Sequence, residues 1–329
     1  MAGPTSTPTG TPTSSAARAD GATPTTRELL TRPDRRRHAV DRVMRVVVTI
    51  AFLVAMIPLV SLVWIVLSEG YHRLSPYFLA VSMRGVFGGM DAGGIYHAIV
   101  GTLLVTGAAA VISVPIGMMT AVYLVEYGRG ALARAVTFFV DVMTGIPSIV
   151  AGLFAYALFA IFLGPGVRMG VAGAVALSVL MIPVVVRSTE EMLRLVPNEL
   201  REASLALGVP KWRTIVKVVL RTSAAGIVTG VMLAVARVIG ETAPLLITLG
   251  VVDSINYDLF DGRMMTLPVF IYRQYSQGLV PCRPDQLDCI ATVNFDRAWA
   301  AALVLVVIVL LLNLLARVVA RRFAPATGH

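Results

Sequence analysis

Blocks of residues without Asp, Glu, Lys or Arg follow one another along most of the chain, separated by short charged segments. A helix that crosses a bilayer needs about 20 mainly apolar residues, and each block approaches or exceeds that length. The pattern therefore predicts an all-α integral membrane protein with six transmembrane helices. The blocks are 46–68, 92–125, 142–167, 169–186, 222–252 (interrupted only by Arg237 and Glu241) and 298–316.

The second and fifth blocks are longer than one span, so we expect each to include interfacial or re-entrant backbone. Pro115 and Pro147 lie inside predicted spans, where proline is tolerated as a kink. Residues 1–43 are rich in Thr, Pro, Ser and Ala, end in a basic segment and offer little to bury. They are predicted to form a disordered cytoplasmic tail, and the polytopic membrane domain is predicted to cover 44–325.

Composition agrees with a membrane location. Charged residues make up 14% of the chain, against about 25% in soluble globular domains. Two cysteines exclude a disulfide-dense secreted scaffold, and four scattered histidines lack the spacing of metal ligands. The net charge of +9 could suggest a nucleic-acid partner, but the chain has no soluble basic domain. We therefore expect a membrane lipid environment, no nucleic acid and no metal.

The basic residues predict the orientation. If the N-terminus is inside, segments on the cytoplasmic side hold eighteen Lys and Arg residues and the opposite segments hold seven. The positive-inside rule then places both termini in the cytoplasm of a multi-pass plasma-membrane protein. A cleaved signal peptide is the rival interpretation, because basic residues precede the first apolar block. A signal h-region has only about 7–15 residues, and no tail of this length normally precedes it.

The segment 187–221 between the fourth and fifth blocks predicts a short helix, a turn and a second helix. Asn198 is a plausible N-cap, and Gly208 suits the left-handed residue that ends a helix. Pro210 suits the first turn of the next helix. Leu200, Ala203, Ser204 and Leu207 form an apolar stripe at helical spacing. On periodicity alone, this segment is an amphipathic connector on the membrane surface.

The residues E-A-S-L-A-L-G, Glu202 to Gly208, resemble the signature that ABC-importer permeases carry in their coupling loop. The resemblance implies that Glu202, Ala203, Ser204 and Gly208 dock onto a cytoplasmic ATPase. Ser204 replaces the second Ala of the signature, and Arg221 stands where the signature has Pro, which removes an expected kink. The resemblance covers about residues 97–316.

A narrower resemblance links the stretches 144–156 and 237–244 to the A-type permease subunit of bacterial phosphate-specific ABC importers. It implies a second homologous permease, two copies of an ATPase subunit and an extracytoplasmic phosphate-binding protein as partners. The chain's two lysines, Lys211 and Lys217, do not follow glycine, so the ATP-binding phosphate loop is missing. The chain is therefore expected to have no catalytic residue and no cofactor of its own, with ATP and Mg²⁺ bound by the partner ATPases.

Placing the charged side chains of Arg237 and Glu241 in a membrane span costs free energy. Four residues apart on one helix, they could pair and serve only to fix helix packing. The alternative is a substrate pathway in which the Arg237 fork binds two phosphate oxygens and Glu241 regulates it, with the Thr242 hydroxyl as a further donor. Both interpretations stay open at the level of sequence.

Cys282 and Cys289 lie in the loop predicted to be outside, where disulfides persist. Two free thiols are the alternative to a bridge between them. For the whole chain, the sequence favours the permease of a phosphate importer. A permease for another solute is the nearer alternative. A secondary anion transporter or a channel is the more distant alternative, because neither a secondary transporter nor a channel needs a coupling loop.

Overall fold

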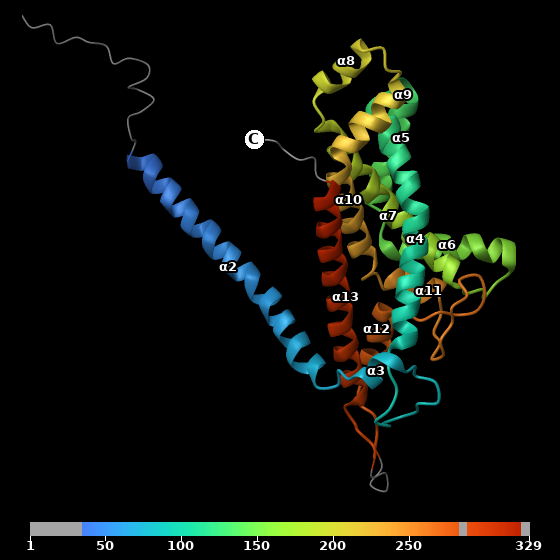
Figure 1. Ribbon diagram of the computed structural model, residues 1–329. Helices are drawn as coiled ribbons and strands as arrows, with labels where there is room; N and C mark the ends of the chain where they lie inside the picture. The colour runs from blue at the N-terminus through green and yellow to red at the C-terminus, as the bar shows by residue number, and fades with distance from the viewer. Residues whose placement is uncertain (1–34, 283–287, 324–329) are drawn as a thin grey trace, which may run out of the picture. The chain divides into compact units, whose positions relative to one another are not determined.

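A computed structural model describes residues 35–282 and 288–323 of the chain (Figure 1). These residues form helices, connecting segments and one isolated β-bridge between Met90 and Cys289. Five helices are each long and apolar enough to cross a membrane, and a sixth crossing results if the bent pair α5 and α6 counts as one span. The predicted all-α membrane architecture is confirmed.

The chain divides into two parts by its contacts, residues 1–61 and 62–329. Helix α2 (Arg35–Tyr71) is continuous over 37 residues. It begins inside the segment 1–43 that the composition assigned to the tail, while residues 1–34 lie outside the described residues. In the second part, the last turn of α2 packs closely at Gly70, where an added Cβ would lie 2.8 Å from the Cβ of Leu303.

Helices α4 (Tyr96–Val122) and α7 (Gly170–Arg194) form the centre of the second part, in contact along their length. α4 continues into a π-helical turn, η1 (Tyr123–Tyr127). The block 92–125 is therefore one uninterrupted helix from Tyr96 onward rather than a re-entrant segment, and its interfacial backbone stays a prediction. Small residues bring the two helices together: a Cβ at Gly117 would lie 2.7 Å from a Val185 methyl.

A second close contact fixes the start of helix α12 (Leu267–Gln277) against α4. The Thr102 hydroxyl accepts a hydrogen bond from the Leu267 amide at 2.8 Å and donates one to the Ala98 carbonyl at 2.7 Å. Beside it, a Cβ at Gly101 would lie 2.0 Å from the Met265 carbonyl oxygen. Only glycine allows this approach of the backbones.

We expect Gly101→Ala to destabilise the fold by about 1–3 kcal/mol, the usual range for overpacking a well-packed site. Gly107 lies on the same helix with nothing within 4 Å of an added Cβ, so Gly107→Ala is the matched control. Thermal unfolding of the purified complex in detergent measures both. Equal melting temperatures for the two variants would contradict this prediction and show that the backbone around Gly101 can shift to accommodate a Cβ at little cost in stability.

Helices α5 (Gly130–Thr144) and α6 (Ser148–Leu163) meet at an angle of 108°. The sequence predicted one kinked span over 142–167, so this expectation is corrected: α5 begins before this block, and α6 turns away from it at the break between Thr144 and Ser148. Pro147 contributes to the break, because its ring disfavours the helical conformation for the preceding residue. Figure 1 shows α6 lying across the direction of α4.

After α7 the chain forms α8 (Asn198–Ala206), then α9 (Lys211–Thr214), which passes through the π-helical turn η2 (Ile215–Val219) into α10 (Leu220–Val238). The predicted helix, turn and helix are confirmed for this segment. Helix α8 begins one residue after Pro197, so Asn198 is its first residue rather than its N-cap. Gly208 has φ +75°, the left-handed conformation predicted for it.

The long helix α13 (Val293–Phe323) contacts both α10 and α12 (Figure 1). Helix α10 ends part-way along α13, and α12 lies beside the remainder. The short helix α11 (Ala243–Thr248) and an extended segment connect α10 to α12. The fifth block is therefore not one continuous helix, because it breaks between Val238 and Ala243. Near the start of α13, the chain is covered by α3 (Pro76–Ala80) and the loop that follows it.

Candidate translocation site and coupling surface

Arg237 occupies the last turn of α10 and is exposed on the surface of the isolated chain, whereas its neighbours Ala234 and Val238 are buried. Within the described residues, no carboxylate forms an ion pair with its guanidinium. A charged side chain in a membrane span needs a partner or water. The described part of the chain supplies no such partner, so the guanidinium is open to water or to a group outside these residues.

Glu241 does not share a helix with Arg237. Helix α10 ends at Val238, and the Glu241 amide bonds the Val238 carbonyl in a turn at 3.1 Å. The pairing at a spacing of four on one helix is therefore corrected, and no ion pair joins the two side chains in the described part of the chain. The cause is Pro244, which lacks the N–H that a continuous helix would bond to residue 240, and whose ring would clash there.

Thr242 lies at the N-terminal boundary of α11 and makes no capping hydrogen bond with its hydroxyl. Pro244 is buried against α6: a Cβ at Gly152 would lie 2.6 Å from the Pro244 Cα. The stretches 144–156 and 237–244, which carry the narrower family resemblance, are thus brought together at the two helix breaks. The α6 side of this contact was not foreseen from the sequence.

The coupling loop lies at one end of the second part, where α8 and α9 extend beyond the bundle (Figure 1). Glu202 and Ala203 are exposed, while Ser204 is buried and its hydroxyl lies 2.9 Å from that of Thr214 on α9. The predicted apolar stripe does not face the chain's own core, since Leu207 is 83% exposed. Helix α8 and the residue after it therefore leave apolar and acidic side chains exposed.

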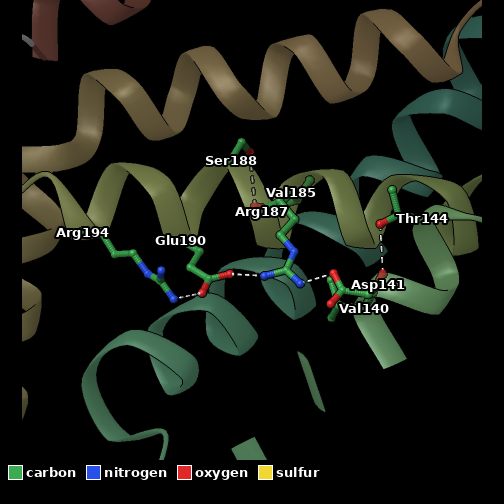
Figure 2. A network of polar contacts seen from close by, with 8 residues as sticks. All are labelled: Val140, Asp141, Thr144, Val185, Arg187, Ser188, Glu190 and Arg194. Carbon is green, nitrogen blue, oxygen red and sulfur yellow. Dashed lines mark hydrogen bonds and ion pairs between the residues drawn. The ribbon is translucent and has the colours of Figure 1, made fainter. Parts of the chain in front are cut away.

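An ion-pair network that the sequence did not predict links α5 to α7 (Figure 2). Arg187 binds Asp141 and, at 2.8 Å, Glu190, which also accepts from Arg194 at 2.5 Å. The Glu190 side chain is 6% exposed, so its charge depends on these two cations. Asp141 and Arg187 stand at the edges of sequence blocks that lack charged residues. Glu190 lies three residues after Arg187 and four before Arg194, spacings that bring side chains together on one helix. These two signals identify the residues of the network but not the contact between α5 and α7.

The structure joins Cys282 and Cys289 by a disulfide bond, with 5.7 Å between the Cα atoms. The Cys289 backbone also pairs with Met90 in the isolated bridge. The disulfide therefore closes a small loop within the segment before α13, and the backbone bridge joins this segment to the loop after α3.

In membranes prepared without reductant, we expect alkylation to label neither Cys282 nor Cys289, because the compartment outside the cytoplasm is oxidising. After reduction, mass spectrometry should find both thiols labelled. Two labelled thiols before reduction would contradict both the bridge and the outside location of this loop.

Residues 113–329 match the family model described as binding-protein-dependent transport system inner membrane component. The chain is 49% identical over 270 residues to the phosphate transport system permease protein PstA 1 of Mycobacterium tuberculosis (strain CDC 1551 / Oshkosh), which covers 82% of this chain and 84% of the relative. The chain belongs to the PstA family of transport permeases. A PstA of Pasteurella multocida is 38% identical, covering 83% of this chain and 93% of its own.

Two solved structures share the fold of this PstA family member. The methionine ABC transporter MetNI in an inward-facing form has a chain with TM-score 0.53 at 20% identity, covering 77% of this chain and all of its own. A bacterial alginate ABC transporter has a chain with TM-score 0.60 at 13% identity, covering 89% of this chain and 99% of its own. The chain is therefore the permease component of an ABC transporter complex, not its ATPase.

Proposed function

We propose that this chain forms part of the path by which inorganic phosphate enters the cell through an ATP-driven importer. The observation that carries the proposal is the Arg237 guanidinium at the end of α10, exposed and without an ion-pair partner among residues 35–282 and 288–323, in a member of the PstA family. The relatives named above are phosphate transport permeases. A phosphate ion that enters an apolar path loses water, and a guanidinium replaces part of that water with two parallel hydrogen bonds.

Arg237 must also release the ion, because conduction needs a site that is favourable to enter and weak enough to leave. Glu241 and Thr242 follow Arg237 across the helix break. We place the Glu241 carboxylate as acceptor for a hydroxyl of protonated phosphate, a hydrogen bond that fully deprotonated sulfate cannot donate. The Thr242 hydroxyl is the additional donor to a phosphate oxygen. In this proposal the helix break, and not a permanent ion pair with Glu241, leaves the Arg237 guanidinium available to the ion.

The assembly that we propose contains a second homologous permease against the face that carries Arg237. Two copies of a cytoplasmic ATPase bind ATP and Mg²⁺, and one of them receives α8, with Glu202, Ala203 and Gly208 on the docking side. A phosphate-binding protein delivers the ion on the opposite side. The excess of Lys and Arg near α8 favours a cytoplasmic location for this loop and for both termini.

The test is uptake of labelled phosphate into proteoliposomes that contain the four components, with ATP supplied on the α8 side and sulfate as competitor. We expect ATP-dependent uptake that excess sulfate does not suppress. Suppression by sulfate would show a general oxyanion importer, and absence of phosphate uptake would favour another solute. Uptake by the purified chain without ATPase or partner permease would reject the importer altogether.

A further inference from the structure

A partly buried arginine of α8 bonds to the segments at the ends of α7 and α4. Arg201 donates to the backbone carbonyls of Val196 at 2.6 Å and Leu193 at 2.9 Å, which end α7. Its Nε donates to the Glu126 carboxylate at 3.0 Å, and a further bond of 3.2 Å reaches the Asn198 side chain. The side chains of Arg201 and Glu126 are only 17% and 7% exposed. Both charges therefore depend on each other.

Glu126 brings α4 into this arrangement. It lies in η1, the π-helical turn that ends α4, while Arg201 is 75 residues further along the chain. The backbone carbonyl of Glu126 also accepts from the Lys211 ammonium of α9, and that ammonium lies 4.6 Å from the centre of the Tyr127 ring. One turn of η1 thus contacts both helices of the coupling loop.

The loop has a second, covalent connection to the membrane helices. α9 runs through η2 directly into α10, which ends with Arg237. The Ser204 and Thr214 hydroxyls hold α8 to α9. A displacement of α8 by a docked ATPase therefore reaches α10 through the backbone. It reaches α4 only through side chains, since no covalent path shorter than the whole of α5, α6 and α7 joins them.

We infer that the Glu126–Arg201 ion pair is the connection that carries movement of α8 to α4, so that α4 and α10 move together when ATP is bound. Glu126 and Arg201 act as positioning residues and do not touch the transported ion. This inference rests on the proposed ATP-driven function. It extends that function to a residue outside the loop signature.

Physical considerations favour a mechanical role for this pair. A buried ion pair adds little net stability, because desolvation of the two charges offsets their attraction. It does, however, specify geometry, since separating the charges leaves the Glu126 carboxylate, 7% exposed, without its cation. Helical segments joined in this way move as one body until the pair breaks. An apolar contact of the same size would let α8 slide over η1.

Glu126→Gln tests the inference in the complete four-component complex. Gln retains an acceptor for the Arg201 Nε and removes only the charge. We expect the complex to assemble and to hydrolyse ATP, while the phosphate moved per ATP falls at least about fivefold, the lower end for coupling between sites. Glu199→Gln is the matched control, an exposed carboxylate at the start of α8 without an ion-pair partner in the described residues.

Hydrogen exchange gives a readout that does not depend on the transported solute. In the unaltered complex, ATP should change amide exchange in α8 and also in the last turns of α4 and η1. In Glu126→Gln, we expect the change in α8 to persist and the change in 119–127 to disappear. Arg201→Lys, which keeps the charge and loses the fork, should fall between the two.

Three results would overturn the inference. One is a parallel fall of hydrolysis and uptake in Glu126→Gln with an unchanged ratio, which indicates a merely structural pair. Another is an unchanged ratio at full activity. The third is an ATP-dependent exchange change in 119–127 that survives the substitution. If the unaltered complex moves no phosphate, the proposed substrate fails, and the exchange experiment still decides whether Glu126 carries the movement.

Discussion

Arg237→Gln should lower ATP-driven phosphate uptake at least about 30-fold while the complex still assembles. The substitution removes charge-assisted hydrogen bonds to the anion, each worth about 1.5–3 kcal/mol, and a loss of about 2 kcal/mol corresponds to about 30-fold. Arg237→Lys should restore uptake only in part, because a point charge does not reproduce the planar fork. Initial uptake rates at matched protein levels measure both effects.

The control for this substitution is Arg134→Gln, the same change at an exposed arginine on α5 that forms no ion pair in the described residues. Since the structure separates Glu241 from Arg237, Glu241→Gln should have the smaller effect of the two. The double variant should be as defective as Arg237→Gln alone. Recovery of transport in the double variant would show that charge balance matters and that Arg237 does not touch phosphate. Normal transport by Arg237→Gln would leave the substrate open.

Gly208→Asp should uncouple ATP hydrolysis from uptake, with a fall of at least tenfold in phosphate moved per ATP. Gly208 has φ +75° and no atom within 4 Å of an added Cβ, so the fold has room for a side chain. The backbone conformation costs a non-glycine residue about 1–2 kcal/mol, and the new carboxylate alters the surface that α8 presents. Transport and hydrolysis measured on one proteoliposome preparation give the ratio.

Gly164→Asp is the matched control, because Gly164 has φ +97° and equally open surroundings at the far end of α6. Its ψ of 161° makes the backbone at least as unfavourable for a non-glycine residue as at Gly208, and it lies away from the coupling loop. Glu202→Lys reverses an exposed charge on α8 and should uncouple in the same way, since no ion pair of the described chain depends on Glu202. Full coupling in Gly208→Asp and Glu202→Lys together would reduce α8 to an ordinary surface helix.

The sequence predicted the features that depend only on the bilayer or on the backbone conformation of a single turn. Apolar blocks identify membrane helices because lipid leaves the backbone no alternative partner. Gly208 and Pro210 located the turn after α8, because their allowed backbone angles are local properties. The class of fold and the helix, turn and helix around Gly208 follow from such features, whereas the docking role of this segment is implied only by the family resemblance.

The sequence failed where the outcome depends on packing between distant segments. Pro115 lies within a continuous helix, whereas Pro147 and Pro244 accompany breaks. The breaks at the last two are stabilised where Gly152 admits Pro244, a contact that no local pattern encodes. Likewise, Asp141 and Arg187 are 46 residues apart, and the sequence does not say that α5 and α7 meet there.

The end of α10 part-way along α13 has an electrical consequence. Moving one elementary charge across a membrane potential of 100 mV takes about 2.3 kcal/mol. An importer must do this work on each negative charge that it moves into a cell with a negative interior. A fixed guanidinium leaves the total unchanged, because it does not cross the field. It lowers the potential energy of the ion at one depth, so the work is divided into a step before Arg237 and a step after it. The voltage dependence of uptake should therefore report how deep in the membrane α10 ends.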